Sequence, residues 1–272
     1  MLPAGSHQPP SATPTPPEGF DWRRALWHGA FLLGFAALMA WAWQGARIDP
    51  VLFLQHSENS MKLAREFFPP DFTDWRIYVD EMAVTLHMAL WGTFLAVIAA
   101  IPLGILGASN ITPWWIYQPI RRMMDMLRAV NEMVFALFFM VSVGLGPFAG
   151  TLALAVHTAG VLGKLFSEVV ESIDHRPVEG IRSTGANRLE EVVYGVIPQV
   201  LPMWVSYTLY RFESNVRSAA VVGMIGAGGI GFFLNETMKT YNYPAVAAIM
   251  AMIIATVMVI DVISARIRKA AL

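Results

Sequence analysis

Residues Glu179–Pro198, EGIRSTGANRLEEVVYGVIP, form a polar interruption between long apolar segments. Pro177, just before this stretch, suits the first turn of a helix, and Gly185 suits the left-handed residue that ends one. Asn187 and Glu190 have the spacing of a capping box, so a second short helix should begin there and close at the final proline. The stretch therefore predicts two capped helices at a bend, a polar structure that suits a soluble partner and not lipid.

The composition places most of the chain in a membrane. Of 272 residues, 56% are hydrophobic and only 14% are charged, which is more apolar than a soluble domain. The net charge of -1 gives no reason to expect nucleic acid as a partner. Because the chain has no cysteine, disulfides, thiolate chemistry and cysteine zinc sites are excluded.

The apolar segments predict an all-α membrane protein with about six transmembrane helices. Residues 1–21 are rich in proline and predict a disordered cytoplasmic tail. Residues 22–79 should hold a first transmembrane helix and a periplasmic loop, and residues 80–272 the core of the protein. An apolar run at 25–46 has the length that spans a bilayer. Further spans are expected at about 81–106, 127–143, 148–172, 203–224 and 244–264.

Basic residues predict the orientation of these spans. In this arrangement the basic clusters of the N-terminal flank, the polar stretch and the C-terminal end fall on one side, which the positive-inside rule assigns to the cytoplasm. Both chain ends and the polar stretch should therefore be cytoplasmic. The residues concerned are Arg23, Arg24, Arg121, Arg122, Arg176, Arg182, Arg188, Arg266, Arg268 and Lys269.

The fifth predicted span carries charges that need an explanation, because a charge at mid-bilayer costs roughly 2.5 to 3.5 kcal/mol. Glu213 and Arg217 have the i,i+4 spacing of a helical ion pair. Tyr207, Arg211 and Asn215 lie on another face of the same helix. Two interpretations remain open, namely an ion-pair clasp between helices and a water-filled anion path lined by Arg211.

The neighbouring spans carry similar groups. Arg128, Asn131 and Glu132 should share a helix face, either as an internal salt bridge or as a contribution to the same path. Lys164 and Glu168 are expected to form a solvated or helix-packing pair. His87 and His157 are single histidines in apolar segments, and we interpret them as packing residues that form hydrogen bonds, not as metal ligands.

A glycine-rich run follows the fifth span. It satisfies G-x-G-x-x-G, but that pattern indicates a dinucleotide site only after a strand in a soluble βαβ unit. We expect a close-packed turn at the outer face or a gate-side loop facing a binding protein. The residues are Gly226, Gly228, Gly229 and Gly231.

The spacing of Glu179, Gly185 and Pro198 resembles the EAA loop of ABC-importer permeases, whose pattern runs E-A-A, G, I-x-L-P. Gly180 and Ile181 stand where that pattern has two alanines. Other runs are similar to phosphonate-importer permeases, and the resemblance covers about residues 67–269. These runs are 131–135 (NEMVF), 143–150 (VGLGPFAG), 213–219 (ESNVRSA) and 222–231 (VGMIGAGGIG).

The resemblance implies an ABC type I importer permease-like bundle in a bacterial inner membrane, with a cytoplasmic coupling loop at 177–200. It implies transport of a phosphonate or a related phosphorus oxyanion such as phosphite or a phosphate ester. ATP would be bound and hydrolysed by a separate subunit, so this chain would have no catalytic residue, metal or cofactor of its own. Two identical permeases, two ATPase subunits and a periplasmic phosphonate-binding protein are the implied partners. The implied coupling residues are Glu179, Arg182, Gly185, Asn187, Arg188, Glu190 and Pro198.

Two other classes of protein remain as alternatives. An ion-coupled secondary carrier would need inverted repeats and broken helices. A membrane-embedded enzyme would need a nucleophile, a metal or an acid and base pair near the bilayer surface, and the sequence offers only scattered single candidates. Copurification of an ATPase would distinguish the importer from both.

Overall fold

The computed structural model describes residues 22–47 and 49–271, so the predicted tail at 1–21 lies outside the described residues. The chain divides into two compact units, one up to Met61 and one from Lys62 onward. In the first unit, α1 (Trp22–Gly45) is apolar and long enough to cross a membrane. The short helix α2 (Pro50–Gln55) begins at Asp49, whose side chain accepts hydrogen bonds from two backbone N–H groups, and α3 (Ser57–Glu66) runs across the boundary.

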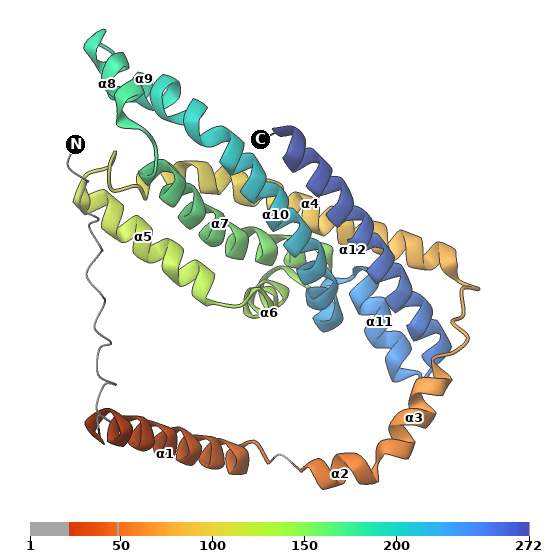
Figure 1. The fold of residues 1–272 in the computed structure, drawn as a ribbon. Helices are drawn as coiled ribbons and strands as arrows, with labels where there is room; N and C mark the ends of the chain where they lie inside the picture. The colour runs from red at the N-terminus through yellow and green to blue at the C-terminus, as the bar shows by residue number, and fades with distance from the viewer. Residues whose placement is uncertain (1–21, 48, 272) are drawn as a thin grey trace, which may run out of the picture. The chain divides into compact units, whose positions relative to one another are not determined.

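The second unit is a bundle of helices (Figure 1). All regular elements of its described residues are helical, which confirms the predicted all-α class. Two of them, η1 and η2, are π-helical. The elements are α4 (Trp75–Leu106), α5 (Trp114–Ala129), α6 (Glu132–Val143), α7 (Pro147–Glu171), α8 (His175–Ser183), α9 (Arg188–Glu190), η1 (Glu191–Val196), α10 (Ile197–Val222), η2 (Gly223–Ala227), α11 (Gly229–Lys239) and α12 (Tyr243–Ala271).

The number of membrane-spanning segments agrees with the expected six. Five helices of the described residues are long and apolar enough to cross a membrane, and the bent pair α5–α6 would make a sixth. The spans expected at 81–106, 148–172, 203–224 and 244–264 fall on α4, α7, α10 and α12.

The single span expected at 127–143 is wrong. The chain ends α5 at Ala129, passes through an extended residue at Val130 and starts α6 at Glu132, with an angle of 89° between the two helices. The Asn131 side chain accepts a hydrogen bond from the N–H of Met133 and caps α6. Asparagine satisfies an orphan N–H at a helix start, so the chain breaks there although the segment is apolar on both sides.

The core of the second unit lies between α4, α7 and α10. A Cβ atom on Gly104 would stand 2.6 Å from the Cβ of Phe166, so α4 and α7 approach closely there. The Trp204 ring of α10 stacks on the Phe166 ring, with 4.6 Å between the ring centroids. Van der Waals packing of this kind drives helix association in lipid, where the hydrophobic effect between helices is absent.

The ends of the bundle carry different structures. In Figure 1, α8 and α9 lie at one end and α11 lies at the other, and α10 runs from the first toward the second. The glycine-rich run expected as a turn begins α11, an eleven-residue helix that we did not expect from the sequence. The polar stretch and the glycine-rich run therefore lie at opposite ends of the bundle.

Candidate functional site

The predicted first helix of the polar stretch is α8. Its N-terminus is capped by Asp174, whose carboxylate accepts a hydrogen bond from the N–H of Arg176 at 3.0 Å. Pro177 lies in the first turn, as expected. The helix ends at Ser183, and Gly185 has a φ of +86°. This confirms the left-handed conformation predicted for Gly185.

The predicted capping box is also present. The N–H of Glu190 donates to Asn187 Oδ1 at 3.0 Å, and the N–H of Asn187 donates to Glu190 Oε2 at 2.7 Å. The expectation that this second helix closes at Pro198 is wrong, because one helical segment continues from Arg188 to Ala227 through η1, α10 and η2. Pro198 lies at the start of α10, directly after η1, so its missing N–H falls where the π-helical turn passes into the α-helix.

A bidentate ion pair joins α8 to η1. Arg182 donates through Nε to Glu191 Oε1 at 2.8 Å and through Nη2 to Glu191 Oε2 at 2.9 Å. These hydrogen bonds raise the pKa of the Arg182 guanidinium. Because the Arg182 side chain is 65% exposed, the pair contributes little stability, but its fork geometry orients α8 against the start of the long helix.

Gln199 makes a second connection, which the sequence reasoning missed. Its Nε2 donates to the backbone carbonyl of Gly195 at 2.6 Å and of Asp174 at 3.2 Å. In return, the N–H of Asp174 donates to Gln199 Oε1 at 3.2 Å. A single glutamine inside an apolar run was the available signal. Through it the start of α8 is fastened directly to α10.

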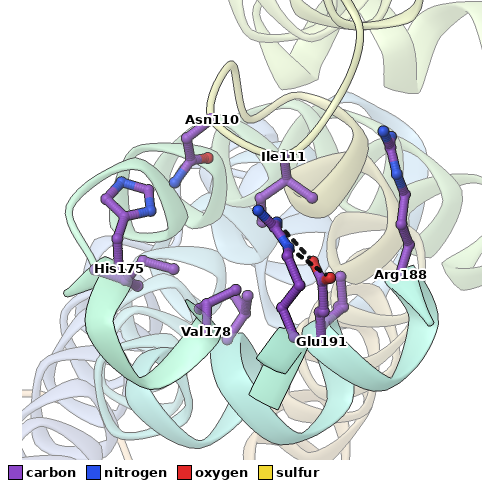
Figure 2. A pocket seen from close by; sticks show the side chains of 10 residues that line it. Asn110, Ile111, His175, Val178, Arg188 and Glu191 are labelled. Carbon is purple, nitrogen blue, oxygen red and sulfur yellow. Dashed lines mark hydrogen bonds and ion pairs between the residues drawn. The ribbon is translucent and has the colours of Figure 1, made fainter. Parts of the chain in front are cut away.

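A cavity of about 290 Å³ opens between α8, η1 and the α4–α5 connection. Figure 2 shows Glu191 between His175 and Arg188, and its dashed lines mark the hydrogen bonds that Glu191 accepts from Arg182. The α4–α5 connection is held in place because Asn110 donates to the carbonyl of Val170 at 2.8 Å. The cavity is lined by Asn110, Ile111, Ile173, His175, Val178, Arg182, Arg188, Glu191, Val192 and Val196. Glu179 and Glu190 do not line the cavity, and both are exposed.

The charges of α10 pair with α12 and not with each other. Arg268 donates to Glu213, and Arg217 Nη1 donates to Asp261 Oδ1 at 3.2 Å. The predicted Glu213–Arg217 pair within α10 is therefore wrong, because each residue finds an opposite charge on the neighbouring helix. For these two residues the geometry is that of an interhelical clasp. Asp261 was missed, although a single acid in an apolar span is a recognisable signal.

Arg211 is different from these two residues. Its Nε atom is buried and has no hydrogen-bond partner among the described residues. The acid whose charge acts on it most strongly is Glu132, at the start of α6. A buried polar donor without an acceptor is rare in folded proteins and marks a place where a ligand could supply one. The clasp interpretation therefore does not apply to Arg211.

Glu132 belongs to a polar cluster at the break between α5 and α6. Ser218 of α10 donates to Glu132 Oε1 at 2.7 Å, and His157 of α7 has its Nε2 3.6 Å from Glu132 Oε2. The other ring nitrogen of His157, Nδ1, is 2.9 Å from the carbonyl of Val130. The salt bridge expected between Arg128 and Glu132 on one helix face is wrong, because the break separates them.

Asn215 ties three helices together in the core. It donates through Nδ2 to Thr93 Oγ1 of α4 at 2.9 Å, and Thr158 Oγ1 of α7 donates to Asn215 Oδ1 at 2.9 Å. Tyr207 packs against the hydrophobic cluster around Trp204. For Asn215 the observed contacts are those of a buried structural junction, and a part in a path remains a prediction for both residues.

The geometry predicted for Lys164 with Glu168 is present, and so is the close-packed bend predicted for the glycine-rich run. Lys164 Nζ and Glu168 Oε1 are 3.8 Å apart, as an i,i+4 pair. The run forms a close-packed bend, in which a Cβ atom on Gly231 would stand 1.8 Å from the carbonyl oxygen of Ala220. The φ angles of +117°, +81° and +70° belong to Gly226, Gly228 and Gly229.

Residues 100–271 match the family model described as "Binding-protein-dependent transport system inner membrane component". The chain belongs to this family. It is therefore a multi-pass inner-membrane transport protein, and a permease of this kind works together with an ATPase and a substrate-binding protein.

Permeases whose names refer to phosphite or phosphonate transport are similar to this chain. It is 35% identical over 252 residues to the phosphite transport system permease protein PtxC of Stutzerimonas stutzeri, which covers 92% of this chain and 91% of that protein. It is 60% identical over 118 residues to the putative cryptic phosphonate transport system permease protein PhnE2 of Escherichia coli, covering 43% of this chain and 97% of that protein.

A solved structure has the same fold as the permease. The MetNI methionine ABC transporter in an inward-facing conformation is similar with a TM-score of 0.66 at 20% identity. The match covers 74% of this chain and 99% of that chain. The expected ABC type I importer architecture is thus confirmed.

Proposed function

We propose that this permease moves a phosphonate or a related phosphorus oxyanion, such as phosphite or a phosphate ester, into the cytoplasm. The observation that carries the proposal is the 35% identity over nearly the full length to a permease named for phosphite transport. Arg211 supports it, because a buried guanidinium edge without an acceptor suits an oxyanion. In this proposal Arg211 lines the path, and the bend at Gly226 and Gly228 gates its outer end.

The energy for transport comes from ATP bound and hydrolysed on a separate subunit, and the permease has no catalytic residue or cofactor of its own. Two ATPase subunits grip two copies of the coupling loop, residues 177–200. The outward-facing residues Glu179 and Glu190 and the cavity beside Arg182 and Arg188 offer polar contacts for such a partner. Because Gln199 and the Arg182–Glu191 pair fasten α8 to the long helix, movement of α8 reaches the membrane-spanning part directly.

A second copy of the chain completes the transporter in this proposal. Arg217 and Asp261 support a homodimer, because their side chains are 47% and 46% exposed although they lie on membrane-spanning helices. Lipid is a poor neighbour for a charged pair, whereas a second permease would cover it. Two-fold symmetric pairing of one surface is also the commonest way for identical chains to associate.

Copurification followed by transport assays tests the proposal. A tagged permease that is expressed together with its proposed partners should bring down a Walker-motif ATPase and a second, differently tagged permease. ATP hydrolysis in the reconstituted complex should rise when the binding protein carries methylphosphonate or phosphite, and methionine serves as the control ligand. Uptake without any ATPase would indicate an ion-coupled carrier, and stimulation by methionine alone would assign a different substrate.

A further inference from the structure

The polar cluster at the break between α5 and α6 has one unused donor and one unused acceptor. The donor is Arg211 Nε, which is buried without a partner among the described residues. The acceptor is the Glu132 carboxylate, whose Oε2 lies 3.6 Å from His157 Nε2, beyond hydrogen-bond length. Beside the hydrogen bonds from Ser218 and from its own backbone N–H, this carboxylate can still accept another. The Glu132 side chain is 21% exposed, so a ligand can reach it. Ser218 holds the other carboxylate oxygen at 2.7 Å and thereby fixes its orientation.

Arg211 and Glu132 would favour different groups on a bound oxyanion. A guanidinium only donates hydrogen bonds, so it favours an ionised oxygen. An ionised carboxylate only accepts, so it favours a hydroxyl and repels a second ionised oxygen. Inside a membrane-spanning bundle the low dielectric strengthens both effects.

We propose that Glu132 and Arg211 select the singly protonated form of the phosphorus oxyanion, with its ionised oxygen on Arg211 and its P–OH donating to Glu132 Oε2. The inference rests on the proposed function and adds to it the protonation state that is carried. The doubly ionised form would place an oxygen lone pair against the carboxylate and is excluded from the site. Hydrogen-bond geometry, not charge alone, is then the basis of the selection.

The other titratable groups around Glu132 must be separated from this effect. His157 faces it from α7, Arg211 from α10, and α5 contributes Arg128 in its last turn before the break. The segment η2, which also packs on α6, has no titratable side chain. Among these groups only His157 normally titrates near neutral pH, so it is the one that needs a control.

The test is uptake into vesicles containing the complete transporter, measured against the pH on the side of the binding protein at low substrate concentration. Wild-type uptake of methylphosphonate should fall by about tenfold per pH unit above the second ionisation of the substrate, as the singly protonated fraction falls. With phosphite, whose second proton is more acidic, the fall should begin at a lower pH. A midpoint that moves with the substrate cannot come from titration of the protein.

Variants assign the effect to the two residues. Glu132→Gln keeps an oxygen for Ser218 but offers an N–H to the ligand, so its pH profile should be much flatter. Ser218→Ala removes the hydrogen bond that orients the carboxylate, so its profile should lie between those of wild type and Glu132→Gln. His157→Gln removes the imidazole and keeps the carboxylate, so it should retain the wild-type slope. All variants use the same binding protein, so any pH dependence of that protein cancels in the comparison.

Two results would overturn the inference. Equal slopes for wild type and Glu132→Gln would show that the carboxylate does not discriminate, and one common midpoint for both substrates would assign the titration to the protein. If Glu132→Gln fails to assemble, the wild-type midpoints are compared with those of substrate binding to the isolated binding protein, and equal midpoints would assign the selection to that protein. Absence of uptake of any phosphorus oxyanion at every pH would instead overturn the proposed function, and the inference with it.

Discussion

Gly185 is the residue of the coupling loop whose backbone conformation is most demanding. Its φ of +86° is unfavourable for residues with a Cβ, although no atom lies within 4 Å of the position that a Cβ would occupy. Gly185→Val should therefore cost roughly 1 to 3 kcal/mol locally and misplace α8 relative to α9. We expect the variant to insert into the membrane but to lose uptake, either because ATP hydrolysis is uncoupled or because the ATPase is not bound.

Gly180 offers a matched control for that experiment. It lies inside α8 with an ordinary helical φ, and a Cβ there would also meet open space. Gly180→Ala should leave uptake unchanged, since alanine favours the helix. Uptake at the normal rate by Gly185→Val with the ATPase attached would mean that the loop has no coupling role.

Substitutions of Arg211 test whether this residue serves transport or stability. Arg211→Met should abolish uptake, while the assembled complex keeps its melting temperature and its ATP hydrolysis, because no ion-pair partner is stranded. Arg211→Lys should fall between wild type and Arg211→Met, since it keeps the charge and loses the planar fork. Uptake assays and thermal melting of the purified complex check both outcomes. Full uptake by Arg211→Met would exclude any essential role for this charge.

The pairing of α10 with α12 depends on one well-buried ion pair. The Glu213 side chain is 8% exposed, and Arg268 is its partner. Arg268→Met leaves that carboxylate buried and alone, so we expect a loss of about 3 to 5 kcal/mol. The melting temperature of the complex in detergent measures it. Arg266→Met is the control, because Arg266 is exposed and makes no hydrogen bond or ion pair with the described residues, and a melting curve equal for both variants would contradict the pairing.

Local signals made part of these elements predictable from the sequence. The capping box of Asn187 and Glu190 and the left-handed Gly185 are set by residues a few positions apart. By contrast, Arg217 and Asp261 are 44 residues apart in the chain, and Glu213 and Arg268 are 55 apart. Helix packing decides which charged residues pair, so the i,i+4 rule wrongly paired Glu213 with Arg217.

The break between α5 and α6 shows why hydropathy alone did not predict this part of the fold. Asn131 is a recognisable helix cap, but the residues on both sides of it are apolar enough to read as one span. Hydropathy is averaged over a window of about 18 to 20 residues, so a single capping residue does not change the result. The cluster of Glu132, His157 and Ser218 was missed for the same reason, because it exists only when the chain turns at this point.

At the scale of the whole molecule, the topology can be tested directly. The basic residues predict that both chain ends are cytoplasmic. The native chain has no cysteine, so a single cysteine introduced at Gly5 or at Leu272 gives an unambiguous signal. A membrane-impermeant maleimide added to intact cells should label neither position until the membrane is opened. Labelling of either position from outside would reverse the predicted orientation.

The helical segment from Arg188 to Val222 has a mechanical consequence. It measures about 50 Å, and Asn215 is fastened on two sides by Thr93 and Thr158. From this junction the segment extends about 40 Å toward Arg188 and about 10 Å toward Val222, beyond which the chain kinks at Gly226. Tilting of the segment about Asn215 would therefore move its two ends in opposite directions, with a displacement at Val222 about a quarter of that at Arg188.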